Sequence, residues 1–94
     1  MTAKDKIYYL LKEYKGGRYD TNTFCDQFIV TYDTDIDYDE LSKYENELFN
    51  ELSVIIARFS PYEEDLTIPN VYFNEDIIKS KVDEVLDKLI KINQ

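Results

Sequence analysis

Apolar residues recur at spacings of three and four along four stretches of this chain, which is the period of an α-helix that buries one face. The pattern predicts helices over residues 3–15, 21–32, 38–59 and 75–92. Their predicted buried faces are Ile7, Leu10, Leu11 and Tyr14; Phe24, Cys25, Phe28, Ile29 and Tyr32; Leu41, Tyr44, Leu48, Leu52, Ile55 and Phe59; and Ile78, Val82, Val85, Leu86 and Leu89.

Residues that commonly cap helices stand before each of these stretches. Thr2, Asp20 and Asn74 are predicted to cap the first, second and fourth helices with their side-chain oxygens. Asp37, with Glu40 three positions later, predicts a capping box that starts the third helix.

The connection between the third and fourth helices, residues 60–73, is longer than the ~2–8 residues usual in bundles, and it is rich in apolar residues. We therefore expect it to pack on the helices as a long ordered loop. A chain of 94 residues is long enough for one domain. The predicted fold is a single all-α domain over residues 1–94, a mostly antiparallel four-helix bundle.

The net charge of −9 belongs to one segment, residues 33–65, which holds eleven acids and two bases. The rest of the chain holds nine acids and nine bases and is neutral overall. The acids of the segment are Asp33, Asp35, Asp37, Asp39, Glu40, Glu45, Glu47, Glu51, Glu63, Glu64 and Asp65.

A field of one sign repels nucleic acid and attracts a basic protein surface, so we expect a protein partner and no direct nucleic-acid binding. Tyrosines in or beside the segment, among them Tyr32 and Tyr38, suit such an interface because aromatic anchors supply binding energy while charges steer. The alternative interpretation is that the acids only cap helices and form a solvated face. The predicted contact residues are Asp33, Asp35, Asp37, Asp39, Glu47, Glu51, Tyr62, Glu63, Glu64, Asp65 and Tyr72.

Little in the sequence indicates catalysis or a bound cofactor. The chain has no His, which is the commonest general base, and Cys25 falls on an apolar helix face. The acids at 33–39 begin like a calcium loop, but Tyr38 stands where that loop needs Gly and Tyr44 where it needs Glu. We therefore expect a non-enzyme without metal or cofactor.

No stretch approaches the ~18 consecutive apolar residues that cross a bilayer, and a single Cys cannot form an internal disulfide. These features predict a cytoplasmic protein that does not enter a membrane.

Five short segments carry a resemblance: Gly17-Arg18-Tyr19-Asp20, Phe24-Cys25-Asp26-Gln27-Phe28, Leu48-Phe49-Asn50-Glu51-Leu52, Arg58-Phe59-Ser60-Pro61-Tyr62-Glu63-Glu64-Asp65 and Val71-Tyr72-Phe73. Together they resemble the bacterial self-protective colicin-like immunity family, over roughly residues 5–90. The resemblance implies a helical bundle that binds the nuclease domain of a bacteriocin or contact-dependent toxin and blocks its basic surface with an acidic one. It names no cognate toxin and no contact residue.

Two other functions share parts of this pattern. An acidic helical adaptor, or a nucleic-acid mimic that regulates a basic host protein, would present the same acidic segment. A metal-responsive protein would use the carboxylates at 33–39.

Overall fold

The computed structural model describes residues 2–60, 62, 67 and 73–92, and within them the only regular elements are helical. The four α-helices are α1 (Ala3–Lys15), α2 (Thr21–Val30), α3 (Lys43–Ile56) and α5 (Glu75–Ile92). Two short helical turns, η1 (Thr31–Asp35) and η2 (Tyr38–Glu40), connect α2 to α3. The predicted all-α four-helix bundle is confirmed.

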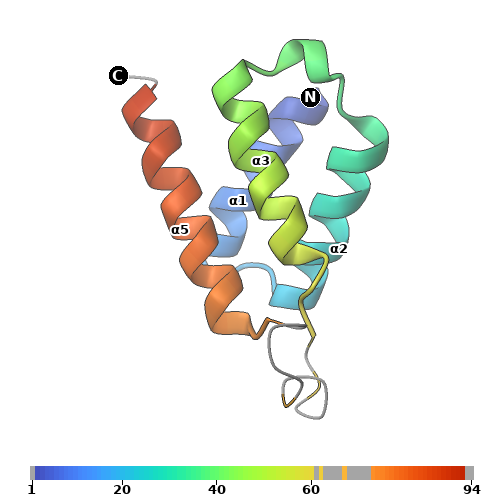
Figure 1. The fold of residues 1–94 in the computed structure, drawn as a ribbon, viewed down its shortest axis with the longest axis vertical. Helices are drawn as coiled ribbons and strands as arrows, with labels where there is room; N and C mark the ends of the chain where they lie inside the picture. The colour runs from blue at the N-terminus through green and yellow to red at the C-terminus, as the bar shows by residue number, and fades with distance from the viewer. Residues whose placement is uncertain (1, 61, 63–66, 68–72, 93–94) are drawn as a thin grey trace.

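The four helices form a closed ring in which each packs on two neighbours, in the order α1, α2, α3, α5. Neighbouring helices run antiparallel, so the chain passes up and down the bundle (Figure 1). The η1–η2 connection and the N-terminus of α1 therefore share one end of the molecule. The turn between α1 and α2 lies at the other end, together with the chain that leaves α3.

Aromatic rings from three helices fill the middle of the core. Tyr14 of α1 stacks on Phe24 of α2 at 4.4 Å between ring centroids, and Phe28 meets Phe49 of α3 edge-on at 6.4 Å. Such ring pairs add about 0.5–1.5 kcal/mol to the free energy gained by burying their area. They join α1, α2 and α3 into one core, to which α5 contributes aliphatic side chains such as Val85.

The predicted caps of three helices are present. The Thr2 hydroxyl accepts a hydrogen bond from the Asp5 N–H, and the Asp5 carboxylate accepts one from the Thr2 N–H, which completes a capping box. Asp20 accepts from the Thr23 N–H at 2.7 Å, and Asn74 accepts from the Ile77 N–H at 3.1 Å. These oxygens satisfy N–H groups that have no partner inside the helix.

The third helix starts later than the sequence pattern predicts. Asp37 caps only the short turn η2, and α3 begins at Lys43 behind a second capping box formed by Ser42 and Glu45. The physical reason is that Ile36 and Leu41, both buried, adopt extended conformations that draw the chain onto the core on either side of η2.

The later start also changes which side chains face inward. Phe49 and Ile56 lie in the core with Leu48 and Leu52, while Tyr44 is 39% exposed, so its predicted burial was wrong. The predicted core residues Ile29, Ile55 and Phe59 are only partly buried. The other predicted core residues, including Cys25, are buried.

Two of the helices also end earlier in the structure than the sequence pattern predicts. α2 ends at Val30, and the chain widens into the π-turn η1, which carries the predicted helical residue Tyr32. α3 ends at Ile56, and residues 58–60 pair with Phe73, two residues before α5. The Phe73 N–H donates to the Arg58 carbonyl at 2.8 Å, and the Ser60 N–H donates to the Phe73 carbonyl at 3.1 Å.

That pairing brings the two ends of the long connection together. Most of the connection, residues 61, 63–66 and 68–72, lies outside the described residues. The prediction that it forms an ordered loop packed on the helices therefore also falls outside them.

Two buried threonines give a test of the core. Thr31 is fully buried, and its hydroxyl has no hydrogen-bond partner in the described part of the chain. Thr21 is also buried, but its hydroxyl lies 2.8 Å from that of Tyr14 and donates to Glu75 at 2.7 Å. We expect Thr31→Val to raise the free energy of unfolding by about 1 kcal/mol, because it removes an unsatisfied polar group.

The matched change Thr21→Val should instead lower the free energy of unfolding by about 1–2 kcal/mol, because it breaks two hydrogen bonds. Urea denaturation followed by circular dichroism measures both. Equal destabilisation by the two changes would contradict this account of Thr31.

Candidate protein-binding surface

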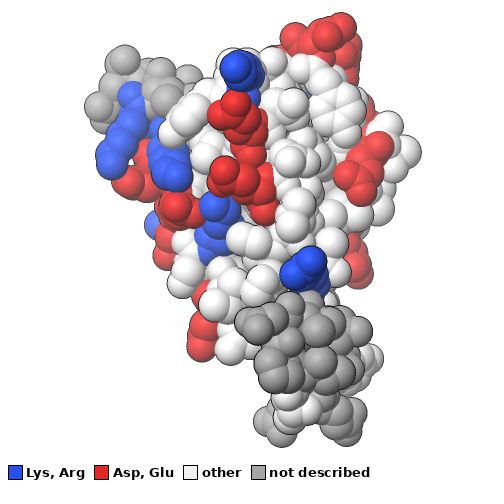
Figure 2. Space-filling model, in the orientation of Figure 1, with Lys and Arg blue, Asp and Glu red and all other residues white. Residues whose placement is uncertain are grey.

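Exposed acids are concentrated in the connection between α2 and α3. We call residues 33–40 the acidic connection; it contains η2 and the end of η1. Its five acids, Asp33, Asp35, Asp37, Asp39 and Glu40, are all exposed. Acidic atoms gather at this end of the molecule and over the exposed side of α3, where Glu47 also lies exposed (Figure 2).

None of these five acids, nor Glu47, forms an ion pair within the described residues, whereas acids elsewhere do. Glu51 lies 3.0 Å from the Lys81 ammonium, and Asp83 lies 3.0 Å from that of Lys15. The charge of the acidic connection is therefore left for solvent or for a partner.

Two tyrosines hold the acidic connection against α3. The Tyr38 hydroxyl donates to the Tyr32 carbonyl at 3.0 Å, and their rings meet edge to face at 5.5 Å. The Tyr32 hydroxyl in turn donates to the Asn46 side-chain oxygen of α3 at 2.7 Å. Tyr32 is buried, while Tyr38 keeps 49% of its surface exposed. These contacts of Tyr32 and Tyr38 fix the backbone of the acidic connection, whose acidic side chains remain exposed.

These residues enclose a shallow surface depression of about 480 Å³, here called the Tyr38 depression. It lies between η1, η2 and α3. Two carboxylates reach it from different elements, Asp33 from η1 and Glu47 from α3. No sequence pattern singled out its three uncharged polar residues, which come from successive turns of α3. The residues that line it are Tyr32, Asp33, Tyr38, Asn46, Glu47, Asn50 and Ser53.

A buried carboxylate fixes the start of α3 beside this surface. Glu45 is 6% exposed and accepts hydrogen bonds from the Tyr8 hydroxyl and, at 2.9 Å, from the Ser42 N–H. The Lys4 ammonium lies 3.2 Å from the same carboxylate and also donates to the Glu40 carbonyl at 3.4 Å. Glu45 therefore ties α1, η2 and α3 together and does not belong to the exposed acidic surface.

The environment of Glu45 changes its acidity. Burial opposes ionisation, but the hydrogen bonds from Tyr8 and Ser42 and the charge of Lys4 outweigh it, so the pKa of the Glu45 carboxyl is lowered. The ionised carboxylate is the form that these contacts with Tyr8, Ser42 and Lys4 stabilise.

The predicted contact residues do not form one continuous patch. Asp33, Asp35, Asp37, Asp39 and Glu47 lie at the end of the bundle where α3 begins, with Glu51 one turn further along α3 and paired to Lys81.

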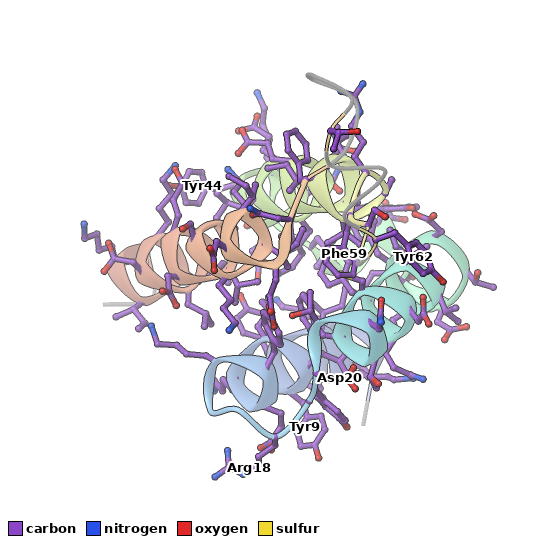
Figure 3. The ribbon with its side chains drawn as sticks, turned by 90° about the horizontal axis from the view of Figure 1, so that it is seen from below. Tyr9, Arg18, Asp20, Tyr44, Phe59 and Tyr62 are labelled. Atoms are coloured by element: carbon purple, nitrogen blue, oxygen red, sulfur yellow. The ribbon has the colours of Figure 1, made fainter. Side chains whose placement is uncertain are left out.

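Tyr62, 65% exposed, lies beyond the other end of α3, on the side of the molecule where Phe59 also lies (Figure 3). A helix of 14 residues spans about 21 Å, so α3 separates Tyr62 from the acidic connection by roughly that distance. The remaining predicted contacts, Glu63, Glu64, Asp65 and Tyr72, lie outside the described residues.

The described residues hold little that resembles a reaction centre. Cys25 is buried, and burial raises the pKa of its thiol to about 12, which keeps it protonated at neutral pH. No group of three or more His, Cys, Asp or Glu residues in the described ranges is placed to hold a metal ion. In the same ranges, no helix combines the length and the apolar character that crossing a membrane requires.

Comparison with known proteins finds no matching family model, no matching curated protein and no matching solved structure. The resemblance to the immunity family therefore stays a prediction from the sequence.

The Glu45 cluster predicts a pH dependence of stability. A carboxyl whose pKa is lowered by folding stabilises the native state fully above its ordinary pKa near 4.5, and this contribution is lost as pH falls through the lower folded value. We expect Glu45→Gln to lower the free energy of unfolding at pH 7 by about 1–3 kcal/mol and to flatten its fall on acidification. Urea titrations between pH 7 and pH 3 measure both effects.

Glu47→Gln is the matched control, because it changes the same charge on an exposed side chain of the same helix. It should change the free energy of unfolding by less than about 0.5 kcal/mol. If Glu45→Gln and the native protein lost stability in parallel below pH 4.5, the assignment to Glu45 would be wrong.

Proposed function

We propose that this protein is an immunity protein that binds and neutralises a cognate bacterial toxin, a nuclease domain of a bacteriocin or contact-dependent toxin. The acidic connection and the adjoining face of α3 would cover the basic surface with which the toxin binds its nucleic-acid substrate. The resemblance of the sequence to the colicin-like immunity family supports this class of partner.

The observation that carries the proposal is the set of exposed acids without ion pairs. In the described residues, Lys4 and Lys15 of α1 and the four lysines of α5 pair with acids of α3 and α5, and none of them pairs with an acid of the acidic connection. Like charges held together on a braced backbone oppose folding. A basic partner would offset that repulsion, and the cluster is therefore better explained by binding than by stability.

The charge pattern also suits a nuclease as the target. A nuclease binds phosphates through Lys and Arg, and such a surface attracts an acidic protein over distances of several ångströms. Complementary fields of this kind raise association rates by about 10–10³-fold and suppress wrong partners. Protection requires capture of the toxin before it cleaves its substrate, so a fast association rate is useful here.

In this proposal the protein acts stoichiometrically in the cytoplasm of the producing cell and catalyses nothing. The lack of His in the sequence and the buried, protonated thiol of Cys25 support a binding role.

The experiment that tests the function is affinity capture of the tagged protein from its native bacterium, grown under conditions that induce toxin production, with elution by a salt gradient. We expect one large protein with a basic C-terminal domain, released as salt rises. Expression of that domain alone should stop growth, and co-expression of this protein should restore it. Capture of a regulatory or housekeeping protein without toxicity would instead support the acidic adaptor function.

Neutralising the acidic connection should slow the association with this toxin. The variant Asp33→Asn/Asp35→Asn/Asp39→Asn removes three charges from side chains that make no ion pair in the described residues. We expect the association rate at low salt to fall on the order of tenfold or more, with a smaller fall at high salt, where charges are screened. Biolayer interferometry at two salt concentrations measures the rate.

The matched control is Asp76→Asn/Asp83→Asn/Asp87→Asn, which makes the same change in net charge on α5. Its association rate should stay within about twofold of the native value, because steering depends on where the charge lies. Equal slowing by both triple variants would show that net charge alone matters and would remove the acidic connection from the interface.

A further inference from the structure

The Tyr38 depression has walls of three different chemical kinds. It has an aromatic side chain that is half exposed, Tyr38, and two carboxylates without ion pairs in the described residues, Asp33 and Glu47. Asn46 and Asn50, which carry side-chain amides, also line it. An acidic patch alone attracts any cation, whereas this combination favours a flat cation that accepts both stacking and several directed hydrogen bonds.

The aromatic wall is fixed in place. The hydroxyl of Tyr38 is held by the Tyr32 carbonyl, and its ring packs edge to face against a Tyr32 ring that is itself stacked on Phe28 at 5.8 Å. Contacts within the protein therefore fix the Tyr38 ring, with its exposed surface toward solvent, before any partner protein binds. A preorganised ring costs little conformational entropy when a ligand stacks on it.

We infer that the Tyr38 depression receives an arginine side chain of the partner protein, with the guanidinium against the Tyr38 ring and its N–H groups directed at Asp33 and Glu47. This inference rests on the proposed function, because it names the side chain that the acidic surface would receive. A guanidinium is planar, stacks on aromatic rings and presents N–H donors in a fixed fork that matches a carboxylate.

Other cations fit the depression less well. A lysine ammonium is compact and strongly hydrated, so it gains from the carboxylates but little from the ring. A divalent cation needs a cluster of ligands, and the described residues contain no group of three acids placed to hold one. One wall of the depression is the aromatic ring of Tyr38, which offers no oxygen ligand to a metal ion.

The test uses the full chain labelled with ¹⁵N and three synthetic peptides, acetyl-Gly-Ser-Xaa-Ser-Gly-amide with arginine, lysine or uncharged citrulline at Xaa. Nuclear magnetic resonance titrations at low salt follow the backbone N–H groups and the side-chain amides of Asn46 and Asn50. We expect the arginine peptide to bind on the order of threefold to tenfold more tightly than the lysine peptide, with shifts centred on the depression. The citrulline peptide, which keeps the shape but has no charge, should bind weakest.

Tyrosine variants separate stacking from charge. Tyr38→Ala should remove the preference for arginine over lysine, while Tyr38→Phe, which keeps the ring, should retain most of it. Tyr44→Ala is the matched control, since Tyr44 is 39% exposed near the start of α3 but does not line the depression. It should leave the preference unchanged. Circular dichroism checks that each variant keeps its helices.

The outcomes separate this inference from the proposed function. Equal binding of arginine and lysine peptides, with shifts spread over all exposed acids, would overturn the arginine site even if a toxin is captured. A preference for arginine that depends on Tyr38 would support the site even if the captured partner proved to be a regulator.

Discussion

The position of the acidic surface depends on one buried carboxylate. Glu45 closes the capping box with Ser42 and also accepts the Tyr8 hydroxyl and the Lys4 ammonium of α1. These contacts hold the start of α3 at Lys43 against α1. The start of a helix sets which of its residues face inward, because the faces repeat every 3.6 residues. With this start, Leu48 and Phe49 enter the core, and Glu47 and Asn50 line the depression below Tyr38.

Three groups of acids with different physical roles therefore occur in this chain. Glu45 is buried and compensated by three donors, as a buried charge must be. Pairs such as Glu51 with Lys81 are partly exposed and contribute little to stability individually. The acids of the acidic connection make no ion pair in the described residues, and this is why they, rather than the whole segment 33–65, form the candidate surface.

The proposed interface combines long-range and short-range interactions. The acids of the connection, which make no ion pair in the described residues, would produce the field that draws a basic partner toward this end of the bundle. The Tyr38 depression acts only at contact, because stacking and directed hydrogen bonds need close approach. Under this proposal, the two effects would explain why an exposed aromatic ring is held in place within a region rich in carboxylates.

The sequence by itself determined the helical class, three of the four helix starts and most of the core, because capping residues and the 3.6-residue period are local signals. It also located the charge. The sequence holds two start signals for the third helix, Asp37 with Glu40 and Ser42 with Glu45. Only the tertiary structure decided between them, because the burial of Ile36 and Leu41 outweighs the local signal of Asp37. It likewise separated Tyr62 from the acids at 33–39 by the length of α3, and placed Asn46 and Asn50 beside Tyr38, since the way η2 folds back on α3 depends on packing and not on local sequence.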